Sequence, residues 1–215
     1  MPSRDYHESL WEGVPEGLPP AGASLREAFL LERLADAGER VDRPLRVLDV
    51  GCGEGHFAAA LARHGAEVVA IDVAEEPLRR ARARHPALDV RLVQPEAPLP
   101  LEDSSFDVVW AGETIEHVAD TSQWLSEVRR LLRSGGLVLL STPDHGALSR
   151  LRLALSRGAF EAHFDPRSDH LRFYTRGGLA DLLADFGFEE VTVAGAGGLP
   201  GARRVLLASG RRKRF

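Results

Sequence analysis

The sequence predicts an α/β fold in which a seven-stranded, mainly parallel sheet carries helices on both faces. Apolar segments with the length of strands alternate along the chain with segments of helical periodicity, and such alternation is typical of parallel sheets. A glycine-rich turn follows the first of these strands at residues 51–55. With 215 residues, of which 44% are hydrophobic, the chain has the length of one domain and enough apolar residues for a core.

The two ends of the chain differ from its middle in composition. Residues 1–22 are rich in Gly and Pro and cannot form a long helix, and a helical pattern of leucines follows Ser24. We therefore divide the chain into an N-terminal tail and helix at 1–44, a main domain at 45–209 and a basic tail at 210–215. The first part is a candidate cover for a cofactor or substrate.

The main domain accounts for all seven strands. They are expected at 45–50, 67–72, 88–93, 106–111, 137–141, 188–193 and 203–208. Helical patterns lie between them at 57–63, 75–84, 120–133 and 175–186. Asp120 and Gln123 are placed to cap the third of these helices, and Gly135 and Gly136 are expected to end it. Because only residues 194–202 join the last two strands, we expect that pair to be antiparallel.

Residues 143–174 interrupt the alternation of strands and helices. They contain one helical pattern, formed by Leu148, Leu151 and Leu155, and several histidines. A long excursion at the carboxyl end of a parallel sheet is typically a lid or a substrate-binding insertion. We therefore expect a helical lid here. The alternative is a segment that only packs against the domain and has no role in ligand binding.

Composition excludes several classes of protein. The net charge of −5 argues against general nucleic-acid binding. The one cysteine, Cys52, allows neither an intrachain disulfide nor an all-cysteine zinc site. The chain has no apolar run long enough for a transmembrane segment, and its N-terminus has no apolar signal core. We expect a cytoplasmic protein whose basic tail is solvated or makes weak contact with an anionic membrane surface.

The glycine-rich turn reads Val47-Leu-Asp-Val-Gly-Cys-Gly-Glu-Gly55 and lies between a strand and a helix. Its glycines allow a tight turn and a close approach of the ligand, and the helix that follows favours an anion such as a carboxylate. His56 stands where dinucleotide-binding loops have their third Gly, which argues against a nicotinamide or flavin cofactor. Asp72 ends the next strand, where an acid can bind both hydroxyls of a ribose.

These motifs together resemble the class I S-adenosylmethionine-dependent methyltransferases, a Rossmann-like family. The resemblance rests on Asp49-x-Gly-x-Gly-x-Gly55, Asp72, Phe106-Asp107, Glu113-Thr-Ile-Glu-His117 and Arg133-Ser-Gly-Gly-Leu137. It extends from Val47 to Ala208, and within the family it points to small O-methyltransferases of the ubiquinone-biosynthesis type. The cofactor that it implies is S-adenosyl-L-methionine.

The resemblance also implies which residues bind this cofactor. The methionine part would be held by Asp49 and the loop residues Gly51, Cys52, Gly53 and Gly55. The ribose would be held by Asp72, with Val73 beside it. The family often has an Asp near the adenine, but this chain reads Pro95-Glu96-Ala97 there, so Glu96 is the candidate. Ala111 and Glu113 would lie near the sulfonium.

Three residues of the N-terminal part are further candidates for the cofactor site. Tyr6 and Trp11 can fold over the cofactor as an aromatic cover, because a cation over an aromatic face is favourable. The alternative is that both belong to a disordered tail. Arg26 can reach the methionine carboxylate, or it is an exposed charge on its helix.

Transfer of a methyl group to a hydroxyl requires a base, or a metal that lowers the pKa of the acceptor. Glu113, Glu116 and His117 follow the fourth strand at i, i+3 and i+4, and can face one point if the turn is helical. We expect Glu113, Glu116, His117 and His170 to form a cluster that binds Mg²⁺ or another divalent metal, or that acts in acid–base catalysis. Without a metal, His117 or His170 would be the catalytic base, with Glu116 beside it. The remaining alternative is a Glu-His pair that only packs and forms hydrogen bonds.

The favoured function is methyl transfer from S-adenosylmethionine to a hydroxyl of a small organic acceptor. A metal-dependent RNA 2′-O-methyltransferase is one alternative, because enzymes of that kind carry a similar Glu-x-x-Glu-His followed by a later Asp-His. A non-catalytic scaffold that binds the cofactor is another, and Pro95 in place of the usual acid is its only support. The acceptor and the oligomeric state stay open.

Overall fold

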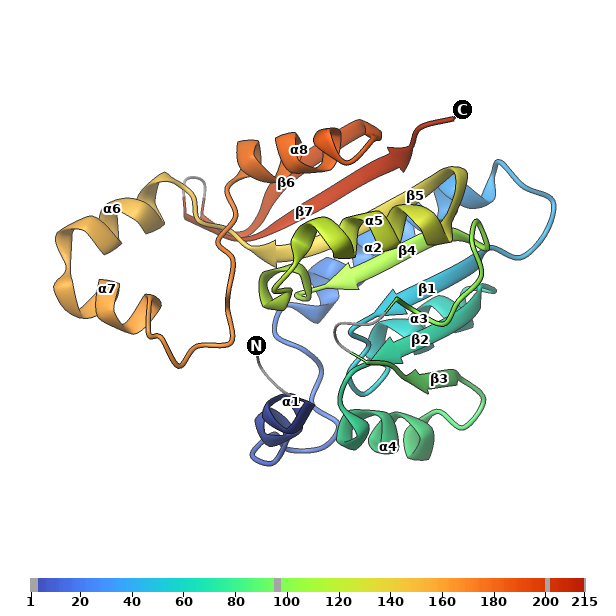
Figure 1. Ribbon diagram of the computed structural model, residues 1–215, viewed down its shortest axis with the longest axis horizontal. Coiled ribbons are helices and arrows are strands. Elements are labelled where there is room, and N and C mark those ends of the chain that lie inside the picture. Colours follow the sequence, from blue (N-terminus) through green and yellow to red (C-terminus); the bar gives the residue numbers. More distant parts are fainter. Residues whose placement is uncertain (1–3, 95–97, 200–201, 215) are drawn as a thin grey trace.

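A single sheet of seven strands organises the molecule. The computed structural model describes residues 4–94, 98–199 and 202–214 (Figure 1). The strand order is β3-β2-β1-β4-β5-β7-β6. The strands are β1 (Arg46–Val50), β2 (Glu67–Asp72), β3 (Asp89–Leu92), β4 (Phe106–Gly112), β5 (Leu132–Pro143), β6 (Phe188–Leu199) and β7 (Ala202–Arg212).

The pairing of the strands confirms the predicted sheet. β1, β2, β3, β4 and β5 pair in parallel, and β7 runs antiparallel to both β5 and β6. The inner strands are buried along nearly their whole length, as expected where both faces of a sheet are covered.

Helices cover both faces of the sheet. One face carries α2 (Ala23–Gly38), α3 (His56–Arg63) and α4 (Glu75–Arg84). The other carries α5 (Thr121–Leu131) and α8 (Arg176–Asp185). Four short elements lie outside these layers: α1 (Arg4–Trp11), the 3₁₀ turn η1 (Ile115–His117), α6 (Ala147–Leu155) and α7 (Arg157–His163). In the described part of the chain, no helix is both long and apolar enough to cross a bilayer.

The end of α5 differs from the prediction. The helix stops at Leu131, and β5 begins at once with Leu132 instead of after Gly135 and Gly136. Leu132 has an extended backbone, is fully buried and pairs with Phe106. Gly135, with φ +75°, then forms the irregularity at the start of the β4–β5 pairing. Burial of Leu132 therefore outweighs the helical pattern at this position.

The insertion and the C-terminal strands also differ from the prediction. The expected single helix of the insertion is followed by a second one, because Ser156 caps α7 through the backbone N–H of Ala159. β6 and β7 are both longer than expected. β7 reaches into the predicted basic tail, where Arg211 binds Glu190 at 3.0 Å.

The carboxyl ends of the parallel strands point to the same side of the sheet. In Figure 1 this is the left side, toward which α6 and α7 of the insertion project, and α1 lies below them. The turn η1 follows β4 at the same edge. Ligands of open α/β sheets bind at this edge. The elements that deviate from the regular alternation therefore surround the place where a site is expected.

Candidate active site

The turn after β1 forms a cradle with left-handed backbone at its three glycines. Gly51, Gly53 and Gly55 have φ of +72°, +52° and +78°. A Cβ at Gly51 would lie 2.6 Å from the side-chain oxygen of Thr114, so a larger residue does not fit there. Asp72 fixes the turn by accepting a hydrogen bond from the backbone N–H of Gly53 at 2.9 Å.

A cavity of about 370 Å³ opens beside this turn. Of the predicted cofactor residues, Gly51, Asp72 and Val73 line it, together with Thr114 and His117. Ala111 is fully buried in β4 and belongs to the core beneath. The candidates Pro95, Glu96 and Ala97 lie outside the described residues. The cavity and the glycine cradle fit a ligand with a ribose and an anionic end.

Asp49 supports the turn from below. Its side chain is 1% exposed, accepts a hydrogen bond from the backbone of Ala58, and leaves Oδ2 without a partner among the described residues. Burial, and then the charge of Asp72, raises the pKa of Asp49 to about 7. Burial also raises the pKa of Asp72, although the N–H groups of Ala74 and Gly53 oppose the shift.

Cys52 lies in the cradle as a buried thiol. Its backbone N–H donates to the carbonyl of Ile71 at 3.0 Å, and burial raises the pKa of the thiol well above its usual range. A thiol that stays protonated is a poor nucleophile. Cys52 therefore contributes its backbone to the turn and no thiolate chemistry.

The N-terminal segment covers the cradle. Trp11 lies over Gly53, so that a Cβ at Gly53 would be 3.1 Å from the indole ring. The guanidinium of Arg80 lies 5.9 Å from the centre of this ring and donates to the backbone oxygens of Trp11 and Val14. Glu8 accepts from the N–H groups at the start of α4, at 2.5 and 3.0 Å. The predicted partner of Trp11 in this cover, Tyr6, has a side chain outside the described part.

Arg26 is buried, contrary to the alternative of an exposed charge. Its side chain is 5% exposed, lies 5.3 Å over the ring of Phe57 and donates to the carbonyl of Ala21. Its guanidinium is 3.9 Å from Glu113 Oε1. Burial lowers the pKa of Arg26, and the charges of Glu113 and Glu116 oppose that shift. A buried cation thus lies next to the acidic residues that follow β4.

Glu113 is the member of the predicted metal set that turns away from the others. It has φ +52°, and its Oε1 accepts a hydrogen bond from the hydroxyl of Ser141 at 2.8 Å. The sequence interpretation assumed a regular helical turn from Glu113 to His117. The observed turn is 3₁₀ and begins only at Ile115, so the i, i+3 relation does not bring Glu113 to the group.

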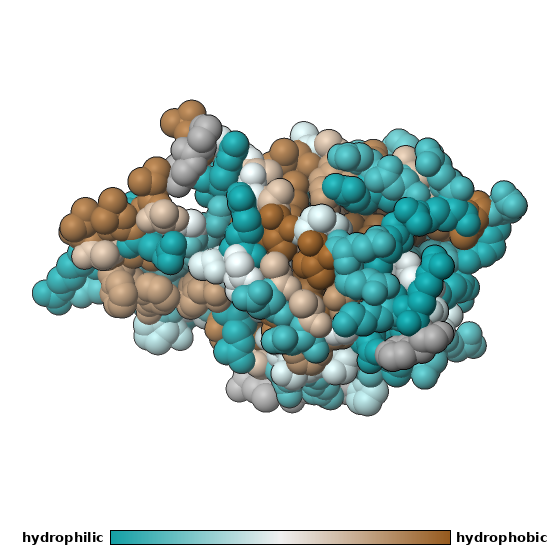
Figure 2. Space-filling model, turned by 90° about the horizontal axis from the view of Figure 1, so that it is seen from above, coloured by the Kyte–Doolittle hydropathy of each residue, from teal (hydrophilic) through white to brown (hydrophobic). Residues whose placement is uncertain are grey.

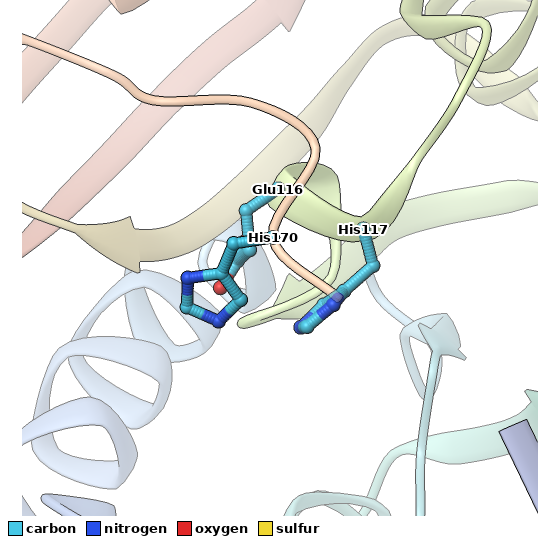
Figure 3. A group of neighbouring side chains, drawn as sticks. All are labelled: Glu116, His117 and His170. Atoms are coloured by element: carbon cyan, nitrogen blue, oxygen red, sulfur yellow. The ribbon is translucent and has the colours of Figure 1, made fainter. Parts of the chain in front are cut away.

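Glu116, His117 and His170 do come together (Figure 3). Their nearest ligand atoms all lie within 4.8 Å of one another. Glu116 and His117 belong to η1, and His170 to the loop after α7. The carbonyl of Glu116 accepts from the N–H groups of Leu171 and Arg172 at 2.8 and 3.0 Å. These two bonds hold the insertion against η1.

Glu116 is completely buried. Its Oε2 accepts a hydrogen bond from Thr142 Oγ1 at 3.0 Å, whereas Oε1 has no partner among the described residues. Burial, and then the charge of Glu113, raises the pKa of Glu116 to about 8. A buried carboxyl oxygen without a partner is unusual, and it points to a ligand or proton at this place.

Asp169 orients His117. Nδ1 of His117 lies 3.0 Å from the backbone oxygen of Asp169 and 3.3 Å from its carboxylate. Because a carbonyl only accepts, Nδ1 carries the proton and Nε2 has a free lone pair. Burial lowers the pKa of His117 more than Asp169 raises it, so the ring is neutral near pH 7. Its ring centre lies 4.9 Å from that of His170.

A second aromatic group lies at the base of the insertion. His145 donates to the carbonyl of Tyr174 at 3.1 Å, and its ring centre is 5.0 Å from that of His163. The ring centre of Phe173 lies 5.2 Å from those of both histidines.

The sequence indicated Asp169-His170 as a pair. It carried no signal for the supporting roles of Ser141 and Thr142, whose hydroxyls reach Glu113 and Glu116 from β5.

The fold and this site are typical of enzymes that bind a nucleotide-like cofactor, and similarity to known proteins shows which family of them this chain belongs to. The sequence pattern of the methyltransferase domain matches residues 23–193. The chain therefore belongs to the S-adenosylmethionine-dependent methyltransferases, as its motifs predicted. Membership in this family implies S-adenosylmethionine as the cofactor.

The curated relatives include enzymes of different specificity. A probable S-adenosylmethionine-dependent methyltransferase of Mycobacterium tuberculosis is 36% identical over 69% of this chain and 50% of the relative. A ubiquinone biosynthesis O-methyltransferase of Roseobacter denitrificans is 38% identical over 68% of this chain and 61% of the relative. A malonyl-[acyl-carrier protein] O-methyltransferase of Pseudescherichia vulneris is 34% identical over 75% and 62%. The chain spans about half to two thirds of the length of these relatives.

Solved structures show the same fold. A methyltransferase from Mesorhizobium loti has a TM-score of 0.62 and 25% identity, and the match covers 84% of this chain and 96% of that one. A carbon methyltransferase has a TM-score of 0.70 over 97% of this chain and 58% of that one. At 19% identity the second likeness concerns the fold alone.

Proposed function

We propose that the chain transfers a methyl group from S-adenosylmethionine to a hydroxyl of a small organic acceptor. The observation that carries this proposal is the group formed by Glu116, His117 and His170 at the edge of the cofactor cavity, which His117 also lines. When bound, S-adenosylmethionine supplies an electrophilic methyl group. The chain's own residues have to hold the cofactor, orient the acceptor and remove the hydroxyl proton.

Cofactor binding is assigned to the cradle after β1. Asp72 binds the ribose hydroxyls, and the turn around Gly51 and Gly53 accommodates the methionine part. Arg26 is the candidate for the methionine carboxylate, because it is a buried cation on the helix that packs beside α3. Trp11 closes the cradle from outside.

His117 is the proposed base. Its Nε2 has a lone pair because Nδ1 donates to Asp169, and burial keeps the ring neutral. It can therefore take the acceptor proton as the oxygen–methyl bond forms. His170 and the carboxyl group of Glu116 lie close enough to pass that proton on or to orient the acceptor.

The same three residues fit a divalent metal. Two imidazoles and one carboxylate are donors that suit a transition metal, and the carboxylate is also a donor for hydrated Mg²⁺. Glu116 Oε1 is a buried oxygen without a partner among the described residues. A metal bound here would lower the pKa of a hydroxyl acceptor. Glu116 would have to lose its proton first, so metal affinity should rise as the pH approaches about 8.

Calorimetric titration with S-adenosylhomocysteine, with and without Mg²⁺, tests these assignments. Asp72→Ala removes the proposed ribose acceptor and should weaken binding by about 30-fold or more. Asp89→Ala is the matched control, because Asp89 pairs with Arg91 on the outer strand β3, and its affinity should equal that of the wild type. Loss of affinity in both variants, or in neither, contradicts the assignment of Asp72.

The metal is tested by the same titration in two further variants. If Mg²⁺ changes the affinity or heat, Glu116→Gln should abolish that change. Glu113→Gln should retain it, because Glu113 turns toward Ser141 and Arg26. Dependence on Glu113 as well would favour the four-residue set that the sequence indicated. If Mg²⁺ has no effect on the wild type, the interpretation that remains is that Glu116, His117 and His170 act in acid–base catalysis without a metal.

A further inference from the structure

The two helices of the insertion leave their apolar side chains uncovered. Neither α6 nor α7 contains a buried residue, and together they form an arm, residues 147–163, that projects from the domain (Figure 1). Leu148, Leu151 and Leu155 follow one face of α6 and are 50, 52 and 78% exposed. Contiguous apolar surface of this kind on a soluble domain usually marks an interaction site.

The end of the β6–β7 hairpin extends this surface. Leu199 is 75% exposed, and α6 packs beside β7. Figure 2 shows hydrophobic side chains gathered at the same end of the molecule, over the arm and near the hairpin. The apolar face is therefore formed by two segments and is larger than one helix.

The charge around this face is opposite in sign to that of the whole molecule. The arm has three arginines and one acidic residue, Glu161, which binds Arg157 at 2.7 Å. α6 itself contains Arg150 and Arg152 and no acid. Arg203 and Arg204 follow near the hairpin end. Since the whole chain has a net charge of −5, the rest of it is acidic.

We propose that the arm docks on a membrane surface that contains anionic phospholipids. The leucines of α6 and Leu199 enter the interface, and Arg150 and Arg152 contact the head groups. An apolar helix face bordered by arginines is what such surfaces bind, and the acidic remainder of the molecule orients the arm toward them. Two arms of like charge would repel one another, which disfavours a second copy as the occupant.

Flotation with lipid vesicles tests the docking with the full chain. Wild type should bind vesicles of phosphatidylcholine with about 30% phosphatidylglycerol at least about tenfold more strongly than phosphatidylcholine alone, and salt should weaken the binding. Leu151→Asp with Leu155→Asp should reduce binding about tenfold or more. Leu18→Asp, at a leucine that is 64% exposed away from the arm, should not.

The charges are tested by a second pair of variants. Arg150→Glu with Arg152→Glu should remove the preference for phosphatidylglycerol. Arg40→Glu with Arg63→Glu makes the same change of charge at two other exposed positions, Arg40 after α2 and Arg63 at the end of α3. This control pair should retain most of the vesicle binding. Equal losses in both pairs would mean that net charge alone attracts the protein, and would overturn the proposal.

Two other outcomes would also overturn it. One is that the wild type does not bind vesicles. The other is that the leucine variant converts a dimer into a monomer without lipid, which would assign the surface to a second copy. Titration of each variant with S-adenosylhomocysteine excludes unfolding as the cause. Vesicle binding requires no methyl transfer, so the result stands apart from the proposed function.

Discussion

At Asp49 the turn after β1 places a carboxyl group where water does not reach it. Its pKa of about 7 lies well above the ordinary value of 3.8. Between these two values the folded protein holds a proton that the unfolded chain has lost. The free energy of unfolding therefore falls as the pH rises from about 4 to about 7, and this group changes it no further above that range.

Asp49→Asn removes this charge and retains an oxygen that can accept from Ala58. At pH 8 we expect the variant without cofactor to be more stable than wild type, by on the order of 2 kcal/mol. At pH 5 the gain should be smaller, because the wild-type carboxyl is then largely protonated. Urea denaturation at both pH values measures the difference. A gain that is equal at the two pH values would contradict the assigned ionisation.

His117 should matter for turnover more than for folding. His117→Asn removes the lone pair of Nε2 and should lower methyl transfer by about 100-fold or more, measured as formation of S-adenosylhomocysteine with a panel of hydroxylated acceptors. His64→Asn is the matched control, since the ring of the exposed His64 forms a hydrogen bond with the carbonyl of Ala60 in its own helix end, at 2.9 Å. If His117→Asn turns over as fast as the wild type, His117 is not the base.

The sequence placed the candidate residues of this group near one edge of the sheet. The structure brings Glu116, His117 and His170 together there, because the carboxyl end of β4 and the insertion lie at the same edge, and their catalytic role stays a prediction. Glu113 does not join them, since its left-handed backbone and its bond to Ser141 are set by contacts with β5. Such contacts between distant segments have no signature in residue spacing.

At the scale of elements, α1 and the loop after it are fastened to α4. Arg80, which is 7% exposed, donates to the carbonyls of Trp11 and Val14 and pairs with Glu54 and Glu76. Buried arginine with several acceptors is costly to replace, because those acceptors lose their partner. The cover over the cradle therefore depends on one side chain of the neighbouring helix.

Arg80→Met should release this cover while α4 stays folded. We expect faster hydrogen exchange in residues 8–17 and about a tenfold faster dissociation of S-adenosylhomocysteine, because Trp11 no longer closes the cradle. Stopped-flow tryptophan fluorescence measures the second effect. Arg82→Met is the control on the same helix, where the exposed guanidinium pairs with Glu75 at 2.6 Å. If both variants behave alike, Arg80 does not hold the cover.

The elements themselves were predictable to different degrees. Strands buried on both faces are short apolar runs, so all seven strands were predicted. The predicted first residues lie within one residue of the observed ones, except in β5, which begins at Leu132 and not at 137. The helix α7 was missed because its seven residues contain one large apolar side chain, Phe160, and therefore no apolar repeat of helical spacing. The exposed helix α6 was found because Leu148, Leu151 and Leu155 do form such a repeat.

For the molecule as a whole, cofactor binding should appear as thermal stabilisation. A ligand at about 100 times its Kd adds about 2.7 kcal/mol to the free energy of unfolding, or about 5 to 10 °C in Tm for a domain of this size. S-adenosylhomocysteine should produce this shift in differential scanning fluorimetry. NADH should not, because His56 replaces the glycine that a dinucleotide site needs. A rise in Tm with NADH and none with S-adenosylhomocysteine would contradict S-adenosylmethionine as the cofactor.

The global architecture followed from the sequence more completely than the site did. The succession of strands and helices along the chain and the antiparallel pair formed by β6 and β7 follow from alternation and loop length. Residues 143–174, which we propose to form the acceptor side, are attached to η1 by the hydrogen bonds from Leu171 and Arg172 to Glu116. Local patterns do not encode bonds of that kind.

The hydrogen bonds between the insertion and η1 run from main chain to main chain. Residues 47–73 form the cradle, whereas residues 143–174 bring His170 and the arm to η1 through the bonds from the N–H groups of Leu171 and Arg172 to the carbonyl of Glu116. Because every residue except proline carries these backbone groups, the attachment does not depend on the side chains at positions 171 and 172. Exchange of side chains in this stretch should therefore alter the acceptor side while the cradle stays intact, so that one nucleotide site can serve more than one acceptor.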